Sequence, residues 1–169
     1  KWLDKILTLY GNYLDLVQTN LPTHLNISDH YMTVSDNDIE QIAEECRNHF
    51  GIGAGPISNM AQLLENNGII LVHIPVEIKA EDAFSKWTQH SQHPVIVFVS
   101  ESPTACRTRF SLAHELGHLI MHKNIQITTA NIKLIEEQAN KFASAFLLPS
   151  HSYTRDFGYP NLDVFRILK

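Results

Sequence analysis

The alternation of hydrophobic and polar positions predicts a chain that mixes helices and strands. Apolar residues at helical spacing predict a helix over residues 36–50, capped by Ser35 or Asp36. A shorter helix is expected to run through Leu64, with Gly68 as its C-cap. The continuous apolar runs 69–74 and 94–100 predict strands buried on both faces, and "AFSKW" (83–87) is a possible further strand.

Two longer helices are predicted after the strands. Ser102 and Pro103 are typical of a helix start, and this helix is expected to reach about residue 122. The next helix covers about residues 131–148 and stops before Pro149. This order predicts an α+β domain in which a small mixed sheet packs on the two helices, with the 94–100 strand near their crossing.

The two ends of the chain are expected to lie outside the domain of residues 36–150. Residues 2–18 are predicted to form a helix that is apolar on more than one side, so we expect it either to pack on the domain or to connect it to a preceding one. The polar, proline-containing stretch 20–36 predicts a linker. Residues 151–169 are expected to be an extension that ends in a truncated helix. Because the chain begins with Lys1, we expect a fragment of a longer protein.

Composition and charge narrow the class of protein. The chain has 169 residues, 44% of them hydrophobic and 18% charged, which suits one folded domain, and its net charge of −5 argues against a nucleic-acid-binding face. No apolar stretch approaches the roughly 20 residues of a membrane span, and no signal peptide is visible. Two distant cysteines, Cys46 and Cys106, fit free thiols in a reducing cytoplasm. "GIGAGP" (51–56) follows a helix and lacks a Lys-Ser/Thr pair, so no phosphate site is predicted.

The chemistry is carried by "HELGHLIMH" (114–122). Residues four apart lie on one side of a helix, so His114 and His118 can converge on one zinc ion. Glu115 lies about 100° away around the axis, beside the metal, where it can take a proton from metal-bound water. The rest of this helix is apolar, and buried histidines and a buried glutamate need something to bind.

A catalytic zinc site needs a third protein ligand. His122 is ~12 Å from His114 along a straight helix, so we do not expect it to bind the metal, although it could line a cleft or lie at the surface. On the next helix, Glu136 is expected on the apolar face and Glu137 nearly opposite. Glu136 is therefore the predicted third ligand of one zinc ion per chain, with a position left open for water. Three further side chains, besides His122, are candidates for orienting a ligand or for the cleft: Asn140, Arg109 and Tyr153.

The two motifs together resemble the ImmA/IrrE family of zinc metallo-endopeptidases. "RFSLAHELGHLIMH" followed by "EEQANKFASAFLLP" carries the resemblance, and "GPISNMAQLLENNGIILVHIP", "DAFSKW" and "PVIVFVS" extend it over residues 36–150. The resemblance implies a zincin-like core with His114, His118 and Glu136 as ligands and Glu115 as base. Many members carry a glutamate where this chain has Gln138, and Glu136 is the residue that matches the ligand.

The resemblance also implies a substrate class. Such peptidases typically cut helix-turn-helix transcriptional repressors, and many carry an N-terminal helix-turn-helix domain that a helix like residues 2–18 connects. We therefore expect an intracellular zinc endopeptidase that acts on a protein, a repressor in particular. The alternative is a sensor or interaction domain of a transcription regulator, which binds a ligand or partner and does not cleave it. Glu115 favours the peptidase, and a preceding DNA-binding domain would favour the sensor.

Overall fold

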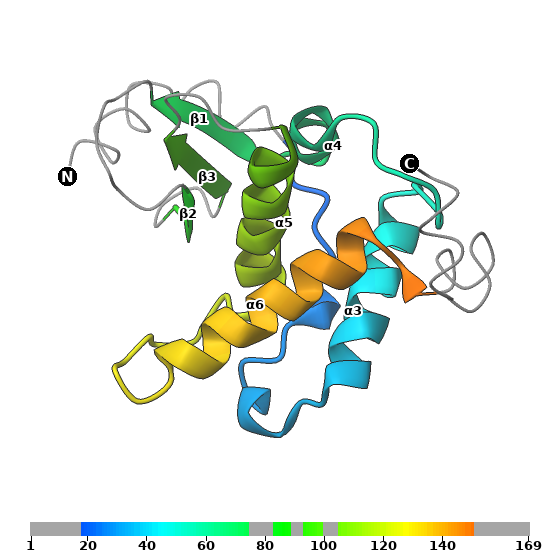
Figure 1. Ribbon diagram of the computed structural model, residues 1–169. Coiled ribbons are helices and arrows are strands. Elements are labelled where there is room, and N and C mark those ends of the chain that lie inside the picture. Colours follow the sequence, from blue (N-terminus) through cyan, green and yellow to red (C-terminus); the bar gives the residue numbers. More distant parts are fainter. Residues whose placement is uncertain (1–17, 75–82, 89–92, 100–104, 151–169) are drawn as a thin grey trace, which may run out of the picture.

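The computed structural model describes residues 18–74, 83–88, 93–99 and 105–150 of the chain (Figure 1). The predictions for the opening helix up to residue 17, for the helix start at Ser102 and for the extension with Tyr153 lie outside these residues. Within the described ranges, no helix is both long and apolar enough to cross a lipid bilayer.

The four predicted helices are present. They are α3 (Asp36–His49), α4 (Met60–Asn66), α5 (Ala105–Met121) and α6 (Ile132–Leu147). Helix α3 begins with a capping box, in which the Ser35 hydroxyl accepts from the Asp38 backbone N–H and the Asp38 carboxylate accepts from the Ser35 backbone N–H. The predicted cap at Ser35 is therefore confirmed.

The three strands form one mixed sheet. Strands β1 (Ile70–Ile74), β2 (Ala83–Trp87) and β3 (Pro94–Val99) lie in the order β1-β3-β2. The central strand β3 pairs in parallel with β1 and antiparallel with β2. Val95, Ile96 and Val97 are buried, as a strand covered on both faces requires. Strand β1, predicted to be equally buried, lies at the edge of the sheet and is only partly covered.

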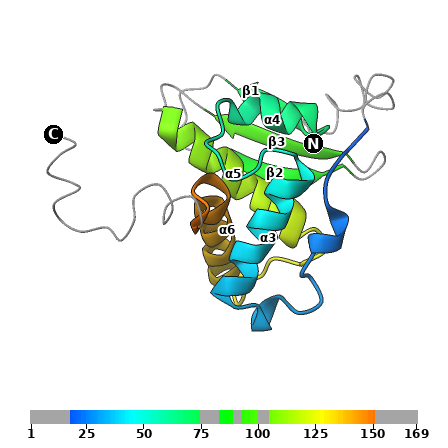
Figure 2. The same ribbon diagram turned by 90° about the vertical axis from the view of Figure 1, so that its right-hand side faces the viewer.

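Helix α5 lies between the sheet and α6, and α3 packs on α6 (Figures 1 and 2). This arrangement confirms the predicted α+β fold. The crossing of α5 and α6 is close at Gly117, where an added Cβ would lie 3.0 Å from Cδ1 of Phe142. Glycine at this position leaves room for the Phe142 side chain of α6 to pack against α5. The crossing brings the polar side chains of α5 and α6 together.

Residues 20–35, predicted as a linker from their polar composition, contribute side chains to the core, although many residues of the segment are exposed. They include two short 3₁₀ turns, Thr23–Leu25 and Tyr31–Thr33, and three buried apolar side chains: Leu21, Leu25 and Ile27. The backbone N–H of Ile27 donates to the carbonyl of Met121 at the end of α5. These apolar residues follow neither a helical nor a strand period, which is why the sequence pattern does not reveal their burial.

The start of this segment also crosses close to the turn after α4. The backbone N–H of Asn20 donates to the Asn67 carbonyl at 3.0 Å. Gly68 has a φ of +77°, and a Cβ there would lie 2.3 Å from the carbonyl oxygen of Gln18. Only glycine suits both the left-handed backbone and this contact. Gly68, the predicted cap residue, therefore also lets the N-terminal segment pack against the turn after α4.

Candidate metal centre

Three side chains from two helices converge beside the α5–α6 crossing. The Nε2 atoms of His114 and His118, one turn apart on α5, lie 3.0 Å from each other. From α6, the Glu136 carboxylate reaches both rings, with Oε2 at 3.1 Å from Nε2 of His114 and Oε1 at 3.4 Å from Nε2 of His118. The structure therefore brings together the three residues that the sequence singled out as ligands.

The geometry and chemistry of these atoms fit a zinc ion. Ligand atoms ~2.0–2.1 Å from a tetrahedral metal are about 3.3 Å from one another, close to the three separations above. Burial, with a contribution from nearby His114, lowers the pKa of His118 from its ordinary value to about 4, so the ring is neutral near pH 7. A neutral ring offers the lone pair that a metal needs. The Glu136 side chain is 47% exposed, so it lies at the margin of the buried face of α6 and the site is open to solvent.

Glu115 lies next to these ligands and points toward the sheet. It is buried, and its carboxylate accepts hydrogen bonds from the side chain and backbone of Ser85 on β2. Burial raises the pKa of Glu115 above its ordinary value, while the bonds from Ser85 and the nearby His114 act in the opposite direction. A buried carboxylate that is held by donors, yet is not among the converging ligand atoms, has the features of a general base.

The strand that contributes a side chain to the site is β2, through Ser85. The predicted strand β3, central in the sheet, also contacts α5, but less extensively than β2 does. The sequence contained a signal for Ser85. In "AFSKW", Phe84 and Lys86 are exposed and the alternate residues are partly buried, so Ser85 is a polar residue on the covered face of a strand.

The other nitrogen of each histidine ligand also has a partner. Nδ1 of His114 lies 3.0 Å from Oδ1 of Asn140 on α6. Nδ1 of His118 lies 3.1 Å from Nδ1 of His122, which is four residues further along the chain and directly follows α5. His122 is buried, and burial lowers its pKa to about 4. The histidine that the sequence left between cleft and surface thus lies behind His118, on the side away from Glu136.

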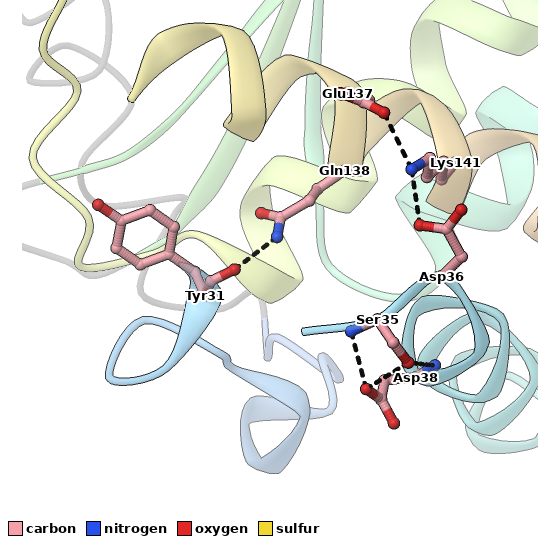
Figure 3. A network of polar contacts seen from close by, with 7 residues as sticks. All are labelled: Tyr31, Ser35, Asp36, Asp38, Glu137, Gln138 and Lys141. Atoms are coloured by element: carbon pink, nitrogen blue, oxygen red, sulfur yellow. Dashed lines mark hydrogen bonds and ion pairs between the residues drawn. The ribbon is translucent and has the colours of Figure 1, made fainter. Parts of the chain in front are cut away.

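The remaining candidates lie elsewhere. The Arg109 guanidinium donates to the backbone carbonyl of Ser58, in the loop before α4, at 2.8 Å. Glu137 forms an ion pair with Lys141, which also pairs with Asp36 of α3 (Figure 3).

Gln138, noted in the sequence only as a departure from the family, is buried and contacts His122. A polar residue between Ile135 and Ala139 on the apolar face of α6 was the signal for it.

Comparison with known proteins agrees with this fold. Residues 64–160 match the model of the Peptidase M78 family, described as the IrrE N-terminal-like domain. No curated protein matches the chain. Among solved structures, a Mycobacterium tuberculosis transcriptional regulator has a TM-score of 0.53 and 20% identity over 77% of this chain and 41% of its own. That likeness concerns the fold, and this chain spans less than half of the regulator's length. Because the family model matches more than half of the chain, this protein belongs to the Peptidase M78 (ImmA/IrrE) family.

Proposed function

We propose that the chain is a zinc-dependent endopeptidase domain that acts on a protein, with His114, His118 and Glu136 as ligands and Glu115 as general base. One observation carries the proposal: the two Nε2 atoms and the Glu136 carboxylate converge within 4.8 Å of one another, beside a carboxylate that is not among them. Two histidines and one glutamate form a ligand set typical of catalytic zinc sites, which keep a position open.

The proposed role of each residue follows from its position. When bound, zinc supplies Lewis-acid chemistry, lowering the pKa of a water molecule and polarising the substrate carbonyl. Glu115 takes the proton of the attacking water as the oxygen bonds to the carbonyl carbon, and returns it to the departing amine as the C–N bond breaks. Ser85 holds the Glu115 carboxylate in place during both transfers. Asn140 holds the ring of His114 through Nδ1.

The proposed substrate is a helix-turn-helix transcriptional repressor, and the proposed compartment is the cytoplasm. The substrate is supported by the family membership and by the description of the structural neighbour as a transcriptional regulator. The compartment is supported by the free thiols of Cys46 and Cys106. The neighbour's description also favours a second candidate, a sensor domain that binds zinc and a partner without cleaving it.

The replacement Glu115→Gln separates the two candidates. It keeps the size of the side chain and leaves the three ligands intact, so about one zinc per chain should be retained. Cleavage of a helix-turn-helix repressor substrate should fall by roughly 10²–10⁴-fold, the usual cost of losing a general base. Zinc is measured by metal analysis, and repressor integrity by gel with the wild type and the variant in parallel. If the wild type leaves the repressor whole, or Glu115→Gln cleaves it normally, the peptidase proposal fails.

A further inference from the structure

A line of hydrogen bonds leads from His118 away from the candidate metal centre to the N-terminal segment. After the contact of His118 with His122, Nε2 of His122 lies 3.2 Å from Oε1 of Gln138. The Gln138 amide nitrogen then donates to the backbone carbonyl of Tyr31 at 2.6 Å (Figure 3). The line thus crosses from α5 through α6 to residues 31–33, and its last bond joins residues that are 107 positions apart.

The two middle members of the line are buried polar side chains outside the ligand set. His122 is 7% exposed and Gln138 is 3% exposed. Among the described residues, the group that could hold a metal contains neither of them. A buried imidazole and a buried amide each cost free energy unless their polar atoms are paired. Within the described part of the chain, the side-chain hydrogen bonds of His122 and Gln138 all belong to the same line.

The far end of the line determines the direction of every proton in it. A backbone carbonyl can only accept, so the Gln138 group that faces Tyr31 must be the N–H donor, and Oε1 must face His122. Nε2 of His122 then carries the hydrogen and donates to Oε1. In a neutral imidazole the other nitrogen is an acceptor, so Nδ1 of His122 must receive a hydrogen bond from Nδ1–H of His118. The lone pair of His118 is then at Nε2, the atom that faces His114 and Glu136.

We propose that His122 and Gln138 are positioning residues through which the Tyr31 carbonyl makes Nε2 the metal-binding nitrogen of His118. The inference rests on the proposed zinc site and adds to it the tautomer and orientation of one ligand. Partners of this kind usually change metal affinity by 10–100-fold when they are lost. The line also makes the N-terminal segment, residues 18–35, part of the machinery that holds the metal.

Two replacements of His122 separate positioning from packing. In His122→Asn, Oδ1 is attached to Cγ as Nδ1 is in histidine, so it can still accept from His118. In His122→Leu, an apolar side chain of similar size leaves Nδ1–H of His118 buried and unpaired. We expect zinc affinity, measured by competition with a chelator, to fall about 10–100-fold in His122→Leu and to stay near the wild-type value in His122→Asn. If His122 only fills space, the order is reversed.

The tautomer of His118 is measured without metal. In metal-free wild type, ¹⁵N chemical shifts should show His118 as the Nδ1–H form, and in His122→Leu as a mixture of both forms. The same mixture in the wild type would overturn the proposal. Because His122→Leu is at risk of misfolding, Gln138→Leu provides a second variant, which should also lower zinc affinity. In the double variant the losses should not add, because both residues act along one line, and additive losses would contradict it.

The outcomes distinguish this inference from the proposed function. If the wild type binds no zinc, both fail. If the wild type and a folded His122→Leu bind zinc equally tightly, only the positioning role fails, and the peptidase proposal stands on its own test with Glu115→Gln.

Discussion

At the scale of single residues, two neighbouring glutamates on α6 have opposite surroundings. Glu136 approaches the Nε2 atoms of His114 and His118 at 3.1 and 3.4 Å, whereas Glu137 pairs with Lys141 at 3.0 Å (Figure 3). Since consecutive helical residues are 100° apart, only one of the pair can face α5. This makes Glu137 a matched control for Glu136.

We expect Glu136→Ala to lose zinc and Glu137→Ala to retain it. Removing a ligand should lower zinc affinity by more than the roughly 10–100-fold that loss of a ligand's hydrogen-bond partner costs. Removing Glu137 breaks one exposed ion pair, and such pairs contribute only about 0–1 kcal/mol to stability. Metal analysis of the two purified variants checks the prediction. Equal zinc content in the two variants would show that Glu136 is not the third ligand.

At the scale of elements, Arg47 joins α3, the glycine-rich loop and the end of α6. Its side chain is 1% exposed, and it donates through Nε to the Gly53 carbonyl at 2.7 Å. The two terminal nitrogens donate to the carbonyls of Gly55 and Phe146. The "GIGAGP" loop, which superficially resembles a phosphate loop, therefore presents its carbonyls to an arginine. Its glycines Gly51 and Gly53 have positive φ, the backbone that turns the chain there.

Replacing Arg47 should loosen these three elements from one another. Arg47→Met keeps an apolar stem of similar length but leaves three carbonyls without their charged donor, which should lower the free energy of unfolding by about 2–4 kcal/mol. Arg47→Lys should recover only part of this loss, because an ammonium cannot reproduce the planar fork of a guanidinium. Urea unfolding followed by circular dichroism measures both. A urea midpoint for Arg47→Met equal to that of the wild type would show that Arg47 does not hold the three elements together.

At the scale of the whole molecule, the buried histidines couple stability to pH. Burial lowers the pKa values of His118 and His122 from 6.5 to about 4. Below pH 6.5 the unfolded chain therefore binds protons that the folded chain does not bind until about pH 4. The free energy of unfolding must fall as the pH drops through this window, and the contribution is fully present above it. The raised pKa of Glu115 increases the free energy of unfolding as the pH falls, which opposes the effect of the histidines. Because there is one such carboxyl and two such rings, the effect of the histidines is the larger.

We predict that the metal-free protein loses stability between pH 7 and pH 5, by on the order of 2 kcal/mol in total. The measurement is the urea midpoint of chelator-treated protein at pH 7, 6 and 5, a range that stops above the ordinary pKa values of most carboxyls. The variant His122→Asn lacks one of the two rings, so its midpoint should depend less on pH. A wild-type midpoint that stays constant over the range would contradict the prediction.

The sequence by itself determined the helices and strands and the proposed metal ligands. The helices α3, α5 and α6 follow from periodic apolar positions and caps, and the strands from short β-branched runs, because these signals act between residues close in the chain. His114 and His118 are neighbours for the same reason, since a spacing of four is a property of any helix. Helical geometry also separated Glu136 from Glu137 before any partner was known.

Only the tertiary structure decided what surrounds the site. Ser85 reaches Glu115 from an edge strand, Gln138 meets His122 across a helix crossing, and Tyr31 closes that line from a segment whose composition is that of a linker. Each of these contacts joins elements whose relative placement depends on packing, including the close approach at Gly117. Periodicity describes which face of one element is apolar. It carries no information on which polar atom of another element that face will meet. The ligands could therefore be predicted, and so could Asn140, which lies one turn from Glu136 on the same helix, whereas Ser85, Gln138 and Tyr31 could not.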